Sequence, residues 1–228
     1  PLKTITVNFN PSPVITGSPT ACNTYQSTFN ATTGLNYNWT ATGGTVVGAS
    51  NLSSATFLWN TAGPQTVSVI TTSVTCPAIT TTKSILINPS PVANFSYSNN
   101  CQAQPVQFTN LSTISSGSIV SLNWDFGDGN TSTLQNPQHT YANAGTFNVV
   151  LTATSDSGCV GTITIPLNIV AFATASAGPP QTICADDTYS LAAAIATNYS
   201  NLLWSSSGTG TFDDQTILHP VYTPSAAD

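Results

Sequence analysis

The chain repeats itself about every 80 residues, and this constrains its fold more than any other feature. The run Asn10-Pro11-Ser12-Pro13-Val14 returns as Asn88-Pro89-Ser90-Pro91-Val92. Two cysteine series and one tryptophan series recur at nearly the same interval: Cys22, Cys101 and Cys184 (the first cysteine series); Cys76 and Cys159 (the second); and Trp39, Trp124 and Trp204. A repeat of this length makes one small domain, so the 228 residues predict a tandem array.

Apolar and polar residues alternate within each repeat. Every second position is apolar in short segments bounded by Gly, Pro, Asn and Ser, as at Val67 and Val69, or at Phe147, Val149 and Leu151. A period of two with β-branched and aromatic residues indicates short, half-buried strands. About seven strands per repeat, with a tryptophan on a central strand, are typical of an immunoglobulin-like β-sandwich. We therefore predict an all-β fold of tandem immunoglobulin-like sandwiches, arranged as an elongated rod.

The repeats divide the chain into four segments. Residues 1–9 match the last strand of a preceding repeat, residues 10–90 and 91–171 form two full repeats, and residues 172–228 form a third without its last two strands. We expect the chain to be a segment of a longer array, because such arrays contain many units. The alternative is donor-strand exchange, in which residues 2–9 complete the third repeat of a neighbouring molecule.

The chain is almost uncharged. Only 4% of its residues carry a charge, and its two cations are Lys3 and Lys83. Binding to a nucleic-acid backbone or to an anionic membrane surface needs clustered Lys and Arg, so we exclude both as partners. No apolar run approaches the roughly 18 residues of a membrane span, so we predict no membrane insertion. The absence of Glu excludes an HExxH zinc site and a standard EF-hand.

Three ordered motifs in the second repeat carry a specific resemblance. They are Trp124-Asp125-Phe126-Gly127-Asp128-Gly129, His139-Thr140-Tyr141 and Ala144-Gly145-Thr146-Phe147. Together they resemble the signature of the polycystic-kidney-disease (PKD) domain, an extracellular β-sandwich, over about residues 91–170. The first repeat resembles a degenerate relative, since it keeps Trp39 and Gly63 but has no acidic run that corresponds to Asp125–Gly129. The third is similar to the Ig-like repeats of large surface adhesins from gliding Bacteroidota.

The resemblance implies structural roles for the motif residues and a place outside the cell for the chain. It indicates a tight turn at Asp125–Gly129, a structural His139-Thr140-Tyr141 turn, and a core position for Trp124. It also implies a secreted or surface-displayed protein, whose partners are a protein or glycan at a surface and the neighbouring repeats of the same chain or fibre.

The cysteines indicate disulfides in an oxidising compartment, because five of them recur at repeat spacing without a CxxC pair. The simpler interpretation pairs Cys22 with Cys76 and Cys101 with Cys159, and leaves Cys184 to a partner outside the chain. In an immunoglobulin-like topology, however, these positions lie at opposite poles of one sandwich, whereas a disulfide brings Cα atoms within about 7 Å. The alternative links repeats stacked end to end, with Cys22 of one repeat bonded to Cys159 of the next.

Asp125 and Asp128 are the candidate metal ligands. Their carboxylates could bind Ca²⁺, which takes six to eight oxygen ligands, but two carboxylates are few for such a site. We expect instead that they accept backbone N–H groups in a turn, while Gly127 supplies a positive φ. We therefore expect no cofactor, with Ca²⁺ as the alternative. The adjacent pairs Asp186-Asp187 and Asp213-Asp214 are weaker candidates of the same kind.

We do not expect an enzyme. The chain offers only His139 and His219 as bases, and no GxSxG nucleophile motif occurs. Trp39, Trp124 and Trp204 occupy one equivalent position, so we expect them in cores rather than in a sugar-binding platform. Trp59 aligns with Tyr141, which indicates the same.

The sequence supports three hypotheses of function. The first is a non-catalytic structural and adhesive segment of a large extracellular surface protein or fibre, which serves as a stalk or spacer. The second is a polymerising extracellular filament subunit. The third is an accessory module of a secreted degradative enzyme.

Overall fold

The computed structural model describes residues 3, 12–32, 36–73, 76–184 and 187–225. Apart from Lys3, the strand predicted at residues 1–9 lies outside the described residues, and so does Asp186. All regular elements of the described part are β-strands, labelled β1 to β20 in chain order, and none is a helix. The chain divides into two compact units: residues 1–96, 108–137 and 148–165, and residues 97–107, 138–147 and 166–228.

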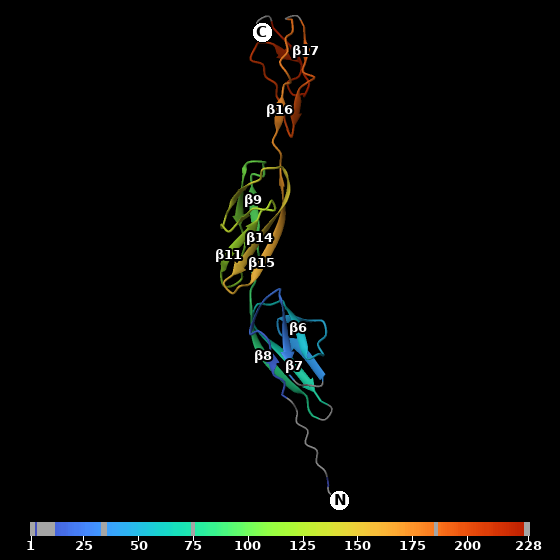
Figure 1. Ribbon diagram of the computed structural model, residues 1–228, viewed down its shortest axis with the longest axis vertical. Coiled ribbons are helices and arrows are strands. Elements are labelled where there is room, and N and C mark those ends of the chain that lie inside the picture. Colours follow the sequence, from blue (N-terminus) through green and yellow to red (C-terminus); the bar gives the residue numbers. More distant parts are fainter. Residues whose placement is uncertain (1–2, 4–11, 33–35, 74–75, 185–186, 226–228) are drawn as a thin grey trace. The chain divides into compact units, whose positions relative to one another are not determined.

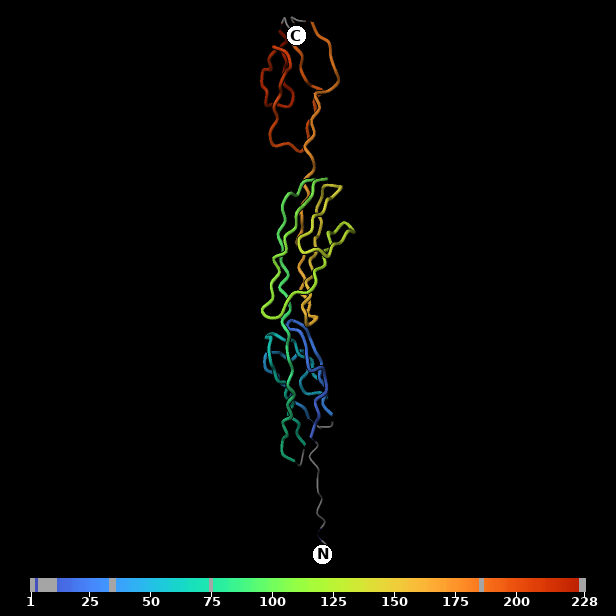
Figure 2. Tube along the Cα trace, turned by 90° about the vertical axis from the view of Figure 1, so that its left-hand side faces the viewer, coloured from blue at the N-terminus to red at the C-terminus, as the bar shows by residue number. Residues whose placement is uncertain are grey.

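The first unit contains a sandwich of two four-stranded sheets (Figure 1). One sheet has the order β1-β3-β6-β5, from β1 (Ile15–Thr16), β3 (Gln26–Ala31), β6 (Ser54–Trp59) and β5 (Gly44–Val47). The other has the order β2-β8-β7-β4, from β2 (Thr20–Cys22), β8 (Ile79–Asn88), β7 (Gly63–Thr72) and β4 (Asn36–Ala41). Strands β7 and β8 form a long antiparallel hairpin, visible as the teal and green trace in Figure 2. Strand β2 is different, because it pairs with β8 in parallel.

Alternation along the strands fills the core of this sandwich. Strand β6 buries Ala55, Phe57 and Trp59 on one face, and β7 buries Val67 and Val69. The ring of Phe57 stacks on that of Trp59 with a centroid distance of 5.7 Å. A fully buried aromatic side chain contributes about 1.5–3 kcal/mol, so this cluster stabilises the packing of the two sheets.

Two further sheets follow in the chain. One has the order β12-β11-β14-β15, from β12 (Thr131–Ser132), β11 (Ile119–Asp125), β14 (Gly145–Ser155) and β15 (Val160–Ile169). The other has the order β13-β10-β9, from β13 (Gln138–Thr140), β10 (Pro105–Asn110) and β9 (Phe95–Ser98). The Trp124 ring on β11 contacts Phe95 on β9 and Phe108 on β10, with centroids 5.2 and 5.6 Å away. Strands of both sheets therefore share an aromatic core.

The last part of the chain forms two small sheets in the second unit. Strands β16 (Thr174–Ser176) and β18 (Ile195–Thr197) make one, and β17 (Tyr189–Ser190), β20 (Val221–Thr223) and β19 (Thr211–Phe212) make the other. Trp204 and Tyr222 both contact the ring of Phe212. The prediction of tandem all-β, immunoglobulin-like sandwiches is thus confirmed, while the predicted domain boundaries stay a prediction.

Candidate functional site

A tight turn between β14 and β15 holds Cys159. The N–H of Ser155 donates to the carbonyl of Cys159 at 2.8 Å, and the N–H of Cys159 donates to Ser155 Oγ at 3.1 Å. The carboxylate of Asp156 accepts hydrogen bonds from the N–H and the hydroxyl of Ser118, at 3.0 and 3.1 Å. These bonds, the backbone one first, lower the pKa of Asp156. The turn is therefore fixed, and Cys159 is buried in it, 1% exposed.

Cys22 ends β2, beside the end of β8. It lies opposite Asn88 in the parallel ladder, and the next N–H, that of Asn23, donates to the carbonyl of Asn88 at 2.9 Å. The chain then turns through Thr24, which has a positive φ of 68° and donates its N–H to the carbonyl of Trp59 at 2.7 Å. The position of Cys22 is thereby set by the sheet itself.

Cys22 and Cys159 form a disulfide, with 5.6 Å between their Cα atoms and a sequence separation of 137 residues. It connects the first repeat to the second. The simpler pairing expected from the sequence, Cys22 with Cys76 and Cys101 with Cys159, is therefore wrong, and the alternative pairing between repeats is the one formed. The physical reason is the immunoglobulin-like topology, which places cysteines of the two series at opposite poles of one repeat. Two such cysteines come within bonding distance only across the boundary between neighbouring repeats.

Further contacts surround this disulfide. The Tyr25 hydroxyl donates to the carbonyl of Val160 at 3.1 Å. The carboxamide oxygen of Asn23 accepts the N–H of Ser90 at 2.5 Å, and the Ser90 hydroxyl donates to the carbonyl of Asn23 at 2.8 Å. We call the residues Cys22–Tyr25, Asn88–Val92 and Cys159–Gly161 the joint. All of them belong to the first compact unit.

Gly161 lies close to the backbone of Pro91 in the joint. A Cβ atom at this position would overlap the carbonyl oxygen of Pro91, so only glycine fits there. A hollow of about 550 Å³ opens beside it, lined by Tyr25, Val92 and Ile163 among others. The joint thus combines a covalent bond, hydrogen bonds and a steric fit.

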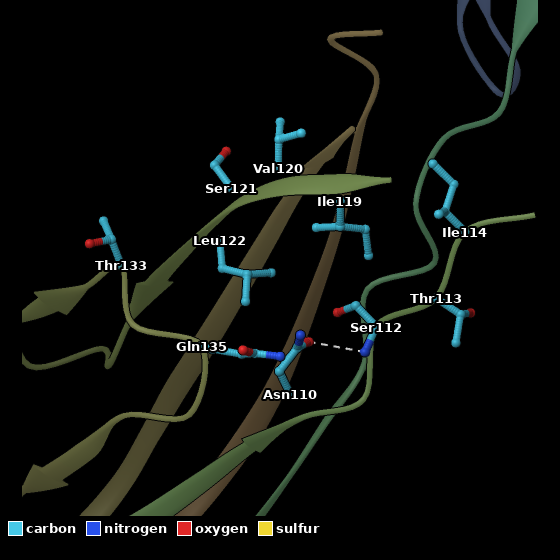
Figure 3. Close-up of a pocket in the computed structure, with 10 residues that line it drawn as sticks. All are labelled: Asn110, Ser112, Thr113, Ile114, Ile119, Val120, Ser121, Leu122, Thr133 and Gln135. Atoms are coloured by element: carbon cyan, nitrogen blue, oxygen red, sulfur yellow. Dashed lines mark hydrogen bonds between the residues drawn. The ribbon is translucent and has the colours of Figure 1, made fainter. Parts of the chain in front are cut away.

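A second hollow, of about 450 Å³, lies over β11 (Figure 3). Its lining is neutral, from residues such as Ile119, Leu122 and Gln135, and Asn110 Oδ1 accepts the N–H of Ser112 at 3.0 Å on one side. The lining offers no charged group to bind an ion or to act as an acid or base.

The turn Asp125–Gly129, which we call the acidic turn, is hydrogen-bonded to its own backbone. Asp125 Oδ1 accepts the N–H of Gly127 at 2.9 Å, and Asp128 Oδ1 accepts the N–H of Asn130 at 3.1 Å. Gly127 has a φ of 78°, and a Cβ there would lie 2.7 Å from the carbonyl oxygen of Asn148. In the described part of the chain, no three His, Cys, Asp or Glu residues gather as a metal site would require. The expectation of no cofactor, with Ca²⁺ as the alternative, stays a prediction.

The remaining motif residues pack or shape turns. The His139 ring lies edge-on to that of Tyr141 with centroids 4.6 Å apart, and Tyr141 is fully buried. Gly129 and Gly145 both adopt positive φ, 92° and 144°. Trp39, Trp59 and Trp124 are buried as expected for core residues.

The tryptophans of the repeats also share one hydrogen bond. Each indole N–H donates to a carbonyl 10 to 13 residues further along the chain: Trp39 to Leu52, Trp124 to Leu134 and Trp204 to Ile217. The three tryptophans therefore make the same type of hydrogen bond in each repeat, which indicates that the repeat in the sequence is also a repeat in the structure.

The weaker candidates also make local hydrogen bonds. Asp213 Oδ1 accepts the N–H of Val221 at 2.7 Å, and the hydroxyl and N–H of Thr216 lower the pKa of Asp214. His219 Nδ1 lies 3.1 Å from the carbonyl oxygen of Leu191. These contacts indicate loop-stabilising roles.

Comparison with known proteins agrees with the motif residues. Residues 88–169 match the family model of the PKD domain. Two solved PKD1 domains, from Vibrio anguillarum Epp and from the Vibrio cholerae metalloprotease PrtV, are 36% and 39% identical. The match covers 36% and 35% of this chain and 95% and 96% of those domains, with TM-scores of 0.34 and 0.33. Residues 88–169 belong to the PKD domain family.

Two curated relatives that match part of this chain are a metalloprotease and a collagenase by name. The pre-pro-metalloprotease PrtV of Vibrio cholerae serotype O1 is 44% identical over 71 residues, 31% of this chain. A microbial collagenase of Vibrio alginolyticus is 47% identical over 53 residues, 23% of this chain. The chain spans only 8% and 6% of the length of these two relatives. The likeness therefore concerns the PKD domain, a non-catalytic module, and not their catalytic parts.

Sequence reasoning missed the residues that position the disulfide. Tyr25, Asn23 and Gly161 gave no signal of their own. The repeated Asn-Pro-Ser-Pro run was a usable signal, because Ser90 and Pro91 of its second copy make joint contacts. The described residues contain no helix that is long and apolar enough to cross a membrane.

Proposed function

We propose that the chain is a non-catalytic, covalently reinforced spacer within an extracellular surface protein or fibre. The observation that carries the proposal is the disulfide between repeats, Cys22–Cys159. A bond across the joint prevents the two repeats from separating under load, and disulfides of this kind persist in oxidising compartments. Buried Trp39 and Trp124 support the same function, since they fill cores rather than contact a ligand.

Composition also supports a spacer outside the cell. Trypsin-like proteases cut after Lys or Arg, and the chain offers only Lys3 and Lys83. Each linker with proline is stiff, because proline fixes φ and favours an extended residue before it. The spacer holds its binding partner, a protein or glycan at a surface, away from the cell.

Single-molecule stretching tests the proposal. With the disulfide intact, the 137-residue loop cannot extend, whereas reduction adds about 470 Å of contour length at roughly 3.4 Å per residue. We expect both repeats to resist force with the joint closed, and the additional length only after reduction. Extension by that length without a reductant would contradict a covalently reinforced spacer.

A second candidate function is supported by the relatives. PrtV and the Vibrio alginolyticus collagenase carry the same domain, which favours an accessory module of a secreted degradative enzyme. Sedimentation of the chain with insoluble collagen, compared with albumin as the control, distinguishes the two. Saturable binding would favour the accessory module, and its absence favours the spacer.

A further inference from the structure

Cys101 occupies the same backbone site in the second repeat as Cys22 in the first. Cys22 lies opposite Asn88 in a parallel pair, and Cys101 lies opposite Val170 in a parallel bridge. In each repeat the N–H of the residue after the cysteine donates to the carbonyl of that same partner. Asn23 donates to Asn88 at 2.9 Å, and Gln102 donates to Val170 at 2.8 Å. The equivalence therefore extends beyond sequence spacing to the ladder itself.

The turns after the two cysteines are also the same. The second residue after each has a positive φ, 68° at Thr24 and 52° at Ala103. Its N–H donates to the carbonyl of an equivalent buried aromatic residue, Trp59 at 2.7 Å or Tyr141 at 2.8 Å. The N–H of the third residue after each cysteine, Tyr25 or Gln104, donates to the carbonyl of that cysteine at 3.3 Å. The two cysteines are thus presented by one and the same local structure.

The two sites differ in what they bind. Cys22 is bonded to Cys159, a member of the second cysteine series that lies in the turn before the last strand of the following repeat. Cys101 is an exposed free thiol. Cys184 belongs to the first series, like Cys101. Its carbonyl accepts a hydrogen bond from the N–H of Asp187, three residues later, at 3.1 Å. Cys184 is therefore not the type of partner that the observed bond joins.

We propose that Cys101 is a disulfide site for the repeat that follows it in the array. Its partner is the second-series cysteine of that repeat, the counterpart of Cys159, and the bond reproduces Cys22–Cys159 one repeat further along. The array is then covalently linked at every joint by the same rule, from the first series of one repeat to the second series of the next. This inference rests on the spacer function proposed above.

The chemistry is ordinary disulfide exchange. The Cys101 thiol and the partner thiol lose two protons and two electrons as their S–S bond forms, and a disulfide-carrying oxidoreductase of the export compartment, or oxidised glutathione, is reduced to two thiols. The exposure of Cys101 gives an attacking thiolate access to the oxidant.

The test inserts a second copy of residues 89–170 directly after residue 170 of the full chain. The inserted copy carries Cys101→Ser, to remove a competing thiol, and Ser157→Ala, to mark its own Cys159 peptide by mass. The chain is refolded in a glutathione buffer, alkylated with iodoacetamide, and digested with pepsin, whose acidic buffer suppresses exchange. Non-reducing mass spectrometry then gives the pairing. Cys22–Cys159 reports in the same molecule that the conditions close a joint.

We expect the original Cys101 linked to the marked Cys159 peptide and Cys22 linked to the unmarked one. Alkylated Cys101 in molecules that contain the Cys22–Cys159 bond would overturn the proposal. A second measurement uses the unmodified 228-residue chain, where Cys101 should react with iodoacetamide as a monomeric thiol. A reducible dimer through Cys101, or a Cys101–Cys184 bond, would overturn the proposal as well. Neither result bears on the stretching experiment, so failure of this inference is distinguishable from failure of the spacer function.

Discussion

Removal of the joint disulfide is expected to destabilise both repeats. The change is the double substitution Cys22→Ser with Cys159→Ser, which leaves no unpaired thiol in the joint. The disulfide closes a loop with a sequence separation of 137 residues. In the chain-entropy account, closing a loop of that length stabilises the folded state by about 5 kcal/mol relative to the unfolded chain. Residual structure in the unfolded chain reduces this, so about 3–5 kcal/mol is the expected loss.

Urea unfolding monitored by tryptophan fluorescence measures this loss. Trp39, Trp59 and Trp124 all lie inside the closed loop and are buried, so the signal reports on the part of the chain that the bond constrains. With a urea dependence of about 2 kcal/mol per M, the midpoint should fall by roughly 2 M. Cys101→Ser is the matched control, because it removes a thiol and leaves the bond intact.

Dithiothreitol provides an independent check of the cause. It should lower the midpoint of the parent chain to that of the double variant and leave the variant unchanged. A decrease below about 1 kcal/mol for the double variant would refute the reasoning, because loop closure would then contribute little to holding the repeats folded.

Four further predictions test the joint and the domains. Gly161→Ala should slow oxidative formation of the Cys22–Cys159 bond at least tenfold, because the added Cβ overlaps the carbonyl oxygen of Pro91. Mass spectrometry of acid-quenched samples measures the rate of bond formation, and Thr164→Ala on the same strand is the control. Asp156→Asn should lower the urea midpoint above about pH 4, and this difference should shrink as the pH falls further. The reason is that the folded-state pKa of Asp156 lies below the unfolded value, so the carboxylate's contribution is lost as the pH falls through the folded pKa. Thr71→Val should raise stability by about 1–2 kcal/mol in calorimetry, because the buried Thr71 hydroxyl has no hydrogen-bond partner in the structure as described. Adding Ca²⁺ or EDTA should leave the melting temperature unchanged, because the acidic turn already satisfies its carboxylates with backbone N–H groups.

The sequence was sufficient to predict the sandwich fold and its core. Alternation places Phe57 and Trp59 on one face of β6, and a residue's face on a strand is a local property. The repeat of tryptophans predicted equivalent core positions for the same reason, which is correct for Trp39 and Trp124. Trp204 is only half-buried, because the sheets around it are small. Disulfide pairing is not local: Cys22 and Cys76 share a repeat, and only the topology sets which poles come together. The sequence indicated that the two cysteine series lie at opposite poles of a repeat. It did not predict the contact between Gly161 and Pro91, because that contact joins residues far apart in the chain.

A chain with so few charges has limited means of fixing one domain against the next. Surfaces between domains are commonly polar. Lys3 and Lys83 are the only Lys or Arg residues in the sequence, so ion pairs contribute little to such a surface here. The joint uses three other means: neutral hydrogen bonds such as Tyr25 to Val160, a close backbone approach at Gly161, and the Cys22–Cys159 bond. Neutral hydrogen bonds contribute only about 1 kcal/mol each and break as soon as the surfaces part. The covalent bond does not, so it is the element that keeps the two repeats of an almost uncharged chain linked when the weaker contacts break.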